Sequence, residues 1–414
     1  MGAYLRLLRN RDFAVIWMGA TASLFGDGLT WVSLVWLTYE LGGSAADVGL
    51  LAACYTAPVI VGGLAAGILL DRFDRRRLLI VDNLIRGAAV LSVPIAASLG
   101  TLSIAHLYAV AAIFGLFYMI SLAGFPSMLP DLVDADDLTT ANAMETISFG
   151  IGGVVGPAVA GILIAQIGAA NNLALDALTY GLFVVCLATV RMLPAVRTAA
   201  GPIASTSGLR PAFEFVLSTP AILAITVMFM AFNVGEGVLL VLLPAYARDV
   251  LGAGPEAYGV LVSAFTAGVL IGSVVIGAVR WPWPLGRSIA AAQLAAGAVA
   301  VGLIGRPSLP VAVLILALVG LFASPLTIWA QTIRMGLIPE ALRGRVFSLL
   351  RTLMQSTPPA GGVLAGAVLA AGGLVPAIVA ISVVMGAPGA IGLFHRSLSR
   401  SGTSPAVTAS TGQV

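Results

Sequence analysis

Long apolar runs, separated by short polar connections, make up most of the sequence. A helix needs about 20 predominantly apolar residues to cross the hydrocarbon core of a bilayer. Twelve runs meet that requirement, near residues 13–40, 46–70, 78–99, 104–128, 140–166, 171–192, 220–246, 257–279, 286–305, 309–333, 346–371 and 374–395. The pattern predicts an all-α membrane protein with twelve transmembrane helices and no inserted soluble domain.

The longest polar break covers residues 193–219 and divides the chain almost in half. We therefore expect an N-terminal six-helix bundle over 1–192, a cytoplasmic linker over 193–219 and a C-terminal six-helix bundle over 220–395. The remaining segment, 396–414, is rich in Ser and Thr and is predicted to be a disordered cytoplasmic tail.

An internal repeat supports two related halves. Gly26-Asp27-Gly28 reappears 209 residues later as Gly235-Glu236-Gly237. After a slip of one residue, further glycines match in the same order: Gly49 with Gly259, Gly62 with Gly272, and Gly67 with Gly277. Such a duplication predicts two pseudo-symmetric bundles with a substrate site near the midplane between them.

Composition fits this architecture and excludes several other functions. Hydrophobic residues make up 59% of the chain and charged residues 9%, whereas soluble domains carry roughly 25% charged residues. The sequence has no Lys, so it has neither a Walker A loop nor a Lys Schiff base. With two His, at helix ends, an intramembrane hydrolase with a His-based dyad or metal is not supported. We expect no enzyme activity, cofactor, metal or nucleic-acid partner.

The arginines predict the orientation in the membrane. Those on the side of the N-terminus are Arg6, Arg9, Arg11, Arg72, Arg75, Arg76, Arg77, Arg191, Arg197, Arg210, Arg280, Arg287, Arg334, Arg343, Arg345, Arg396 and Arg400. The opposite loops hold Arg248 and Arg306. By the positive-inside rule both termini are cytoplasmic, which agrees with an even number of spans. The Ala-, Gly- and Arg-rich composition suggests a bacterial genome, and hence a multi-pass protein of the bacterial inner membrane.

A charged motif follows the second helix: Gly67-Ile-Leu-Leu-Asp71-Arg72-Phe-Asp74-Arg75-Arg76-Arg77. It resembles the loop signature G-x-L-x-D-R-x-G-R-R/K of the major facilitator superfamily, with Asp74 where Gly is usual. The resemblance implies a cytoplasmic gate in which Asp71 meets the start of the eleventh helix. The arginines would then bind acidic residues such as Asp131, in a latch that forms in one transport state. A simple orientation signal is the alternative.

The fifth helix carries Gly152-x-x-x-Gly156-Pro157-x-x-x-Gly161. This is similar to the Gly-Pro motif of the superfamily's antiporters, with Ala160 as a departure. Helix packing alone also explains these small residues. Other features resemble the macrolide-efflux and enterobactin-exporter branch: Asp27, Asp82 with Arg86, Ala141-Asn142-Ala143 and the segment from Pro339 to Arg345. The fourth helix lacks the Arg that many drug–proton antiporters carry there.

Charges inside predicted helices are the main candidates for function, because a charge at mid-membrane costs about 2.5–3.5 kcal/mol on insertion scales. Asp27 and Glu236 occupy equivalent places in helices one and seven, where burial would let a carboxyl take and release a proton. Glu145 and Arg351 are further candidates for proton coupling or substrate binding, and a structural ion pair is the alternative. Asp82 and Arg86, one turn apart, are expected to form a structural pair. No role is inferred for Asp176.

A substrate cavity needs walls. Aromatic and polar side chains on the expected pore helices are candidates: Phe25, Trp31, Trp36, Phe229, Phe232, Asn233, Gln331 and Gln355. Aromatics with a few polar groups suit amphipathic molecules.

The sequence therefore predicts a monomeric secondary transporter that exports small amphipathic or drug-like molecules by proton antiport, with alternating access. The alternative is a dedicated exporter of a metabolite such as a siderophore, or a lipid transporter. An anionic siderophore would need cations in the cavity. Since the sequence offers Arg351 and Arg334 for that purpose, neutral or cationic cargo is the expectation.

Overall fold

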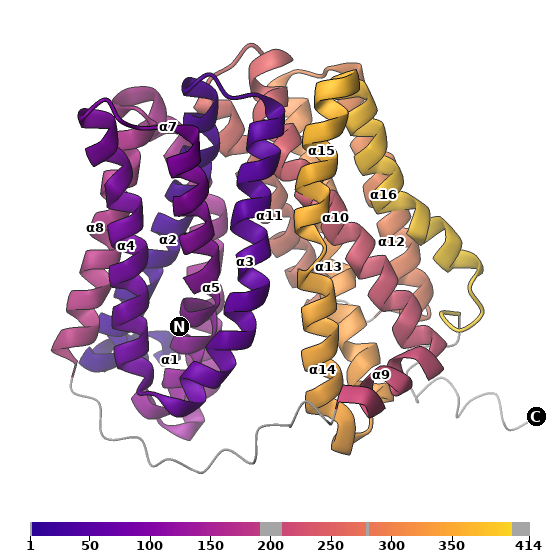
Figure 1. The fold of residues 1–414 in the computed structure, drawn as a ribbon. Coiled ribbons are helices and arrows are strands. Elements are labelled where there is room, and N and C mark those ends of the chain that lie inside the picture. Colours follow the sequence, from indigo (N-terminus) through magenta and orange to yellow (C-terminus); the bar gives the residue numbers. More distant parts are fainter. Residues whose placement is uncertain (1, 191–208, 279–280, 400–414) are drawn as a thin grey trace, which may run out of the picture. The chain divides into compact units, whose positions relative to one another are not determined.

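A computed structural model describes residues 2–190, 209–278 and 281–399, and this part of the chain is helical almost throughout (Figure 1). Most of the expected linker and most of the expected tail lie outside the described residues. The helices group into two compact units. The first comprises residues 1–200 with 243–263, and the second comprises 201–242 with 264–414.

The first unit contains α1 (Gly2–Arg9), α2 (Arg11–Glu40), α3 (Ala45–Arg72), α4 (Arg75–Ser98), α5 (Ile104–Leu132), α6 (Leu138–Gly150), α7 (Gly156–Ile167) and α8 (Ala169–Thr189). A 3-10 turn, Ala135–Asp137, precedes α6, and a π-helical turn, Ile151–Val155, joins α6 to α7. Helix α2 packs against α7 and α8, while α5 packs against α3 and α4. These contacts place α2, α4, α5 and α8 around one core.

The second unit contains α9 (Leu209–Ser218), most of α10 (Pro220–Asp249) and of α11 (Pro255–Ala278), α12 (Leu285–Ala300), α13 (Leu309–Leu337), α14 (Glu340–Gln355), α15 (Pro358–Gly372) and α16 (Leu374–Phe394). A 3-10 turn, Val301–Gly305, extends α12. Helix α12 packs against α13 and α16, as α4 packs against α5 and α8 in the first unit. The order of packing therefore repeats between the halves.

Ten helices of the described chain are long and apolar enough to span a membrane. They correspond to ten of the twelve expected runs. The first run forms the continuous helix α2. It is not among the ten because Asp27 and several Gly, Ser and Thr residues make it more polar than the other spans. The eleventh run is divided into α14 and α15 at Ser356 and Thr357. Two prolines, Pro358 and Pro359, explain the break, since proline disfavours helical geometry in the preceding residue and lacks an N–H donor.

Helix α4 begins at an Asp cap. The Asp74 side chain accepts a hydrogen bond from the Arg77 backbone N–H at 2.8 Å. This bond satisfies one of the unpaired donors at the start of a helix. The residue that departs from the loop signature therefore has a local structural role here.

Glycines on both sides of Asp27 let α2 approach its neighbours closely. A Cβ on Gly26 would collide with the Asp176 carboxylate of α8, and one on Gly28 would lie 2.6 Å from the carbonyl oxygen of Gly152. The side chain between these glycines is held in a fixed direction by two helix contacts.

The second unit repeats the arrangement around Glu236. A Cβ on Gly235 would collide with Met385 of α16, and one on Gly237 would collide with the carbonyl oxygen of Pro358 in α15. In both halves the first glycine faces the last helix and the second faces the preceding one. The Gly-acid-Gly repeat thus reflects the same packing requirement in each unit.

Candidate functional site

A buried arginine joins α2, α4, α5 and α8. Arg86 Nη1 donates to Asp27 Oδ1 at 2.9 Å and lies 3.3 Å from the Tyr180 hydroxyl. Its Nε and Nη2 donate to the two oxygens of Asp82 at 3.2 and 3.0 Å. Nη2 also donates to Ser121 Oγ at 2.6 Å. Three charged groups from two helices are therefore held in one cluster.

Aromatic rings complete the surroundings of this guanidinium. Its carbon lies 4.7 Å from the centroid of the Tyr180 ring and 5.4 Å from that of Phe114. The Arg86 and Asp82 side chains are completely buried, whereas Asp27 is 11% exposed. Charge–charge and cation–π interactions are stronger when water is excluded, so a change of charge on one group strongly affects the others.

The two carboxylates are not equally satisfied. Asp82 accepts from Arg86 twice, from Ser121 Oγ at 2.5 Å and from Asn83 Nδ2 at 3.2 Å. Asp27 accepts from Arg86 and from the Tyr180 hydroxyl, both at Oδ1. Its Oδ2 is buried and has no hydrogen-bond partner among the described residues. Asp27 is therefore the acid of the cluster with a vacant oxygen.

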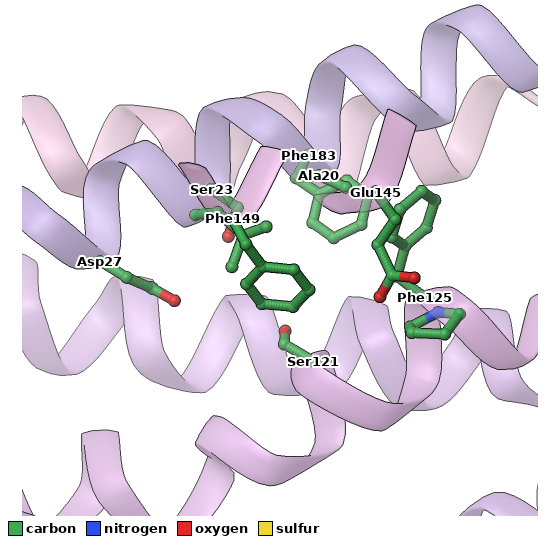
Figure 2. A pocket seen from close by; sticks show the side chains of 10 residues that line it. Ala20, Ser23, Asp27, Ser121, Phe125, Glu145, Phe149 and Phe183 are labelled. Carbon is green, nitrogen blue, oxygen red and sulfur yellow. The ribbon is translucent and has the colours of Figure 1, made fainter. Parts of the chain in front are cut away.

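Asp27 also lines a pocket in the first unit (Figure 2). Glu145, from α6, lines the same pocket and is half-buried. The other lining residues are small, aliphatic or aromatic: Ala20, Ser23, Leu24, Ser121, Phe125, Pro126, Phe149 and Phe183. The pocket thus combines two carboxyl groups with three phenylalanine rings.

The glycine motif of the fifth expected span positions one wall of this pocket. Gly152 lies in the π-helical turn, three residues after Phe149, and Gly156 begins α7. A Cβ on either glycine would press against the backbone of α2. Pro157 stands in the first turn of α7, and Gly161 meets the backbone of Pro255 within the same unit. Isolated π turns are frequent at functional sites.

Asp176 is a second buried acid beside α2. Its carboxylate accepts hydrogen bonds from the hydroxyls of Thr30 and Thr179, and its side chain is completely buried. Since no Arg contacts it among the described residues, it is held by hydroxyl groups alone. This arrangement was not predicted from the sequence.

The remaining coupling candidates lie in the second unit. Glu236 is half-buried and makes no salt bridge among the described residues. The position equivalent to Arg86, counted from the starts of α4 and α12, is Ala296, so the cluster is not repeated. Arg351 is exposed on α14. Asp27 and Glu145 are therefore the two coupling candidates that share a pocket.

The expected cavity residues are dispersed over both units. Trp31 packs on Tyr55 with ring centroids 5.1 Å apart, and Phe25 is half-buried on the same helix. Phe232 is buried, and Asn233 Nδ2 donates to the Met354 carbonyl at 2.8 Å.

Four further candidates, none of them a lining residue of the pocket, are half-buried: Trp36, Phe229, Gln331 and Gln355. The lining residues Phe125, Phe149 and Phe183 were not predicted, because sequence alone does not show which face of an all-apolar helix points inward.

The charged loop motif makes contacts within the first unit. Arg75 Nη1 donates to the Ser127 carbonyl at 2.6 Å and lies 3.4 Å from Asp131 Oδ2. Arg76 Nη2 donates to the Ala188 carbonyl at 2.7 Å. Gly67 has open space around it, and the side chain of Asp71 lies outside the described residues.

The other motif arginines, Arg72 and Arg77, stand at the end of α3 and in the first turn of α4. Nearby, Arg6 pairs with Asp137 at 2.9 Å. The Arg75–Asp131 contact joins two of the residues expected in the latch.

One of the arginines counted for the orientation is buried. Arg334 belongs to the last turn of α13 and is 3% exposed. It is a buried cation of the second unit rather than part of the surface charge that indicates orientation.

Comparison with known families decides the class of the protein. A family model described as "Transmembrane secretion effector" (MFS_3) matches residues 3–407. The chain belongs to the MFS_3 family of major facilitator superfamily transporters. This membership identifies a transporter rather than an enzyme.

The MFS_3 relatives include proteins named as exporters. The chain is 26% identical over 397 residues to "Multidrug efflux pump Tap" of Mycolicibacterium fortuitum, covering 92% of this chain and 94% of that protein. It is 28% identical over 383 residues to Tap of Mycobacterium tuberculosis (strain ATCC 25618 / H37Rv), covering 88% and 89%. It is 25% identical over 348 residues to "Enterobactin exporter EntS" of Shigella boydii, covering 83% and 82%.

Solved structures confirm the fold. A bacterial homologue of the human lysosomal transporter Spinster matches with a TM-score of 0.72 at 14% identity, covering 96% of this chain and 99% of that one. The D-xylose–proton symporter matches with a TM-score of 0.70 at 14% identity, covering 92% and 97%. The MFS_3 chain is thus an all-helical, multi-pass membrane protein with the major facilitator fold and with bacterial homologues.

Proposed function

We propose that this protein exports small amphipathic molecules from the cell in exchange for protons, and that Asp27 is the group at which proton and substrate compete. One observation carries the proposal. Asp27 lines a pocket, is tied to a buried arginine through Oδ1, and presents an unpartnered Oδ2.

The charge balance of the cluster favours a proton on Asp27. With both acids ionised, Asp27, Asp82 and Arg86 carry one net negative charge in a site largely closed to water. Such a charge is costly, and one proton removes it. Because Asp82 uses both oxygens for donors while Asp27 Oδ2 has none, the proton is expected on Asp27.

We infer that the groups lining the pocket contact an amphipathic cargo, cationic or neutral, in a transport state in which the pocket is wider. Asp27 and Glu145 supply negative charge, and a cationic substrate would offset it as a proton does. Phe125, Phe149 and Phe183 offer apolar contact and cation–π interaction. A cation and a proton that neutralise the same carboxylate exclude each other, which is the requirement for antiport.

The wider account follows the family. Alternating access would open the Asp27 pocket to each side of the membrane in turn, with the motif from Gly67 to Arg77 and Asp131 as the cytoplasmic gate and both termini in the cytoplasm. We propose a monomer in the bacterial inner membrane. Export as the direction is supported by the names of the relatives, which are an efflux pump and an exporter.

A second candidate is a dedicated exporter of one metabolite. It is favoured by the buried cation Arg334 and by the similarity to an enterobactin exporter, since an anionic metabolite requires a positive group in the protein.

The test is proton flux in reconstituted vesicles that enclose a pH-sensitive dye. A panel of cationic, neutral and anionic amphipathic compounds is added to wild type, to Asp27→Asn and to Glu40→Gln. Glu40 stands at the exposed end of α2 and serves as the matched control. The proposal expects a cationic or neutral compound to move protons in wild type and Glu40→Gln, and no flux in Asp27→Asn. Compound movement without proton flux in wild type would refute antiport.

A further inference from the structure

Arg334 occupies an unusual position for a charge near a helix end. It stands in the last turn of α13, three residues before Leu337, yet it is 3% exposed. Long cationic side chains near the ends of membrane helices normally extend to water. Helical side chains tilt toward the N-terminal end of their helix, and this one is directed back into the second unit.

The contacts of this guanidinium are weak for a buried charge. Its carbon lies 5.7 Å from the centroid of the Phe229 ring on α10, and Nη2 lies 3.4 Å from the sulfur of Met354 on α14. Its Nε is buried and has no hydrogen-bond partner among the described residues. Since no Asp or Glu side chain in the described part of the chain pairs with it, Arg334 differs from Arg86, which is fully satisfied.

A buried guanidinium without an anion is costly, because it has lost its water and gained no opposite charge. A charged residue inside a membrane helix is therefore a candidate for function, with an anion as the expected partner of an arginine. The aromatic ring beside it and the thioether provide an apolar wall but no negative charge.

Glu236, the acid of α10 closest in sequence to Phe229, does not pair with Arg334 in the structure. Phe229, Asn233 and Glu236 stand four and three residues apart, so they share one face of the helix. Asn233 is bonded to Met354, which fixes this face toward α14. Glu236 lies two turns beyond Phe229, about 10 Å along the axis, and makes no salt bridge among the described residues.

We propose that Arg334 is an anion-binding subsite that takes the carboxylate or another oxyanion of an amphipathic aromatic molecule, with Phe229 packing against its apolar part. The inference rests on the proposed transport of amphipathic molecules, but not on proton coupling. It adds a class of cargo, anionic amphipaths, that the acidic pocket of the first unit does not suit.

The experiment compares two probes of equal shape, 2-naphthoate and its neutral amide 2-naphthamide. Binding is measured by isothermal titration calorimetry on the full chain in nanodiscs of phosphatidylcholine, without any gradient. The variants are Arg334→Gln, Arg334→Lys and the control Arg287→Gln, which changes an exposed arginine at the start of α12. A charge-assisted bond predicts that wild type and Arg287→Gln bind the carboxylate about 10- to 100-fold more tightly than the amide.

The expected results separate binding from structure. Arg334→Gln should remove the preference for the carboxylate, and Arg334→Lys should keep part of it. Thermal stability of Arg334→Gln should be unchanged or higher, because Arg334 has no ionic partner among the residues that the structure describes. No preference for the carboxylate in wild type, or the same preference in Arg334→Gln, would overturn the inference. Suppression of naphthoate binding by phosphatidylglycerol would also overturn it, because that result identifies a lipid headgroup as the occupant. None of these outcomes depends on proton flux, so the two proposals fail separately.

Discussion

Replacing Asp82 should destabilise the first unit much more than replacing Asp27. Asp82 is completely buried and accepts two bonds from Arg86, with further bonds from Ser121 and Asn83. Asp82→Asn removes a buried charge partner of Arg86 and should lower the free energy of unfolding by about 3–5 kcal/mol. Asp27→Asn keeps a carbonyl oxygen for its donors and weakens one charge-assisted bond, so it should cost about 1–2 kcal/mol.

These energies translate into melting temperatures. For a unit of this size, 1 kcal/mol corresponds to about 2–4 °C. Asp82→Asn should therefore lower the melting temperature by about 6–20 °C and Asp27→Asn by about 2–8 °C, measured by tryptophan fluorescence in detergent micelles. The double variant Asp82→Asn with Arg86→Gln should lose less than the sum of its single variants, since it leaves no unpaired cation. Equal losses of melting temperature for the two single Asp variants, or strict additivity in the double variant, would refute this interpretation of the cluster.

Three further changes have defined outcomes. Gly28→Ala should lower the free energy of unfolding by about 1–3 kcal/mol, because its Cβ would lie 2.6 Å from a carbonyl oxygen of the π turn. The control Gly181→Ala places its Cβ in open space and should be neutral or stabilising in the same melting assay. Asp74→Ala should cost about 1 kcal/mol through the lost cap of α4, and Asp74→Asn should restore most of it. Arg75→Gln should change stability by less than about 1 kcal/mol, because its pair with Asp131 is 41% and 27% exposed; unchanged transport by this variant in vesicles would contradict a latch.

Much of the architecture could be predicted from the sequence, because bilayer thickness fixes the length of an apolar helix. The Gly-acid-Gly repeat correctly marked equivalent places in the two units, as the contacts of Gly26 and Gly235 show. The division between α14 and α15 was not predicted. Its signal was the Pro358-Pro359 pair, which the hydrophobic pattern alone obscured.

The site was predicted in part. The spacing of Asp82 and Arg86 indicated a pair on one helix, and that pair is present. Its connection to Asp27 depends on the rotation of α2 and α4 about their axes. In helices apolar on all sides, periodicity does not reveal that rotation. The same limit applied to Arg334, which the sequence offered both as a charge that indicates orientation and as a cation for the cavity.

Exchange of proton and substrate at Asp27 is tested most directly by counting the protons released when a cation binds. Purified protein in a weakly buffered detergent solution is mixed with tetraphenylphosphonium, an aromatic cation that has no titratable proton. The pH change is recorded beside the heat of binding. We predict release of about one proton per bound cation in wild type and Glu40→Gln, and none in Asp27→Asn, as expected for two ligands that neutralise one carboxylate. Binding without proton release in wild type, or equal release in Asp27→Asn, would contradict the claim that proton and substrate exchange at Asp27.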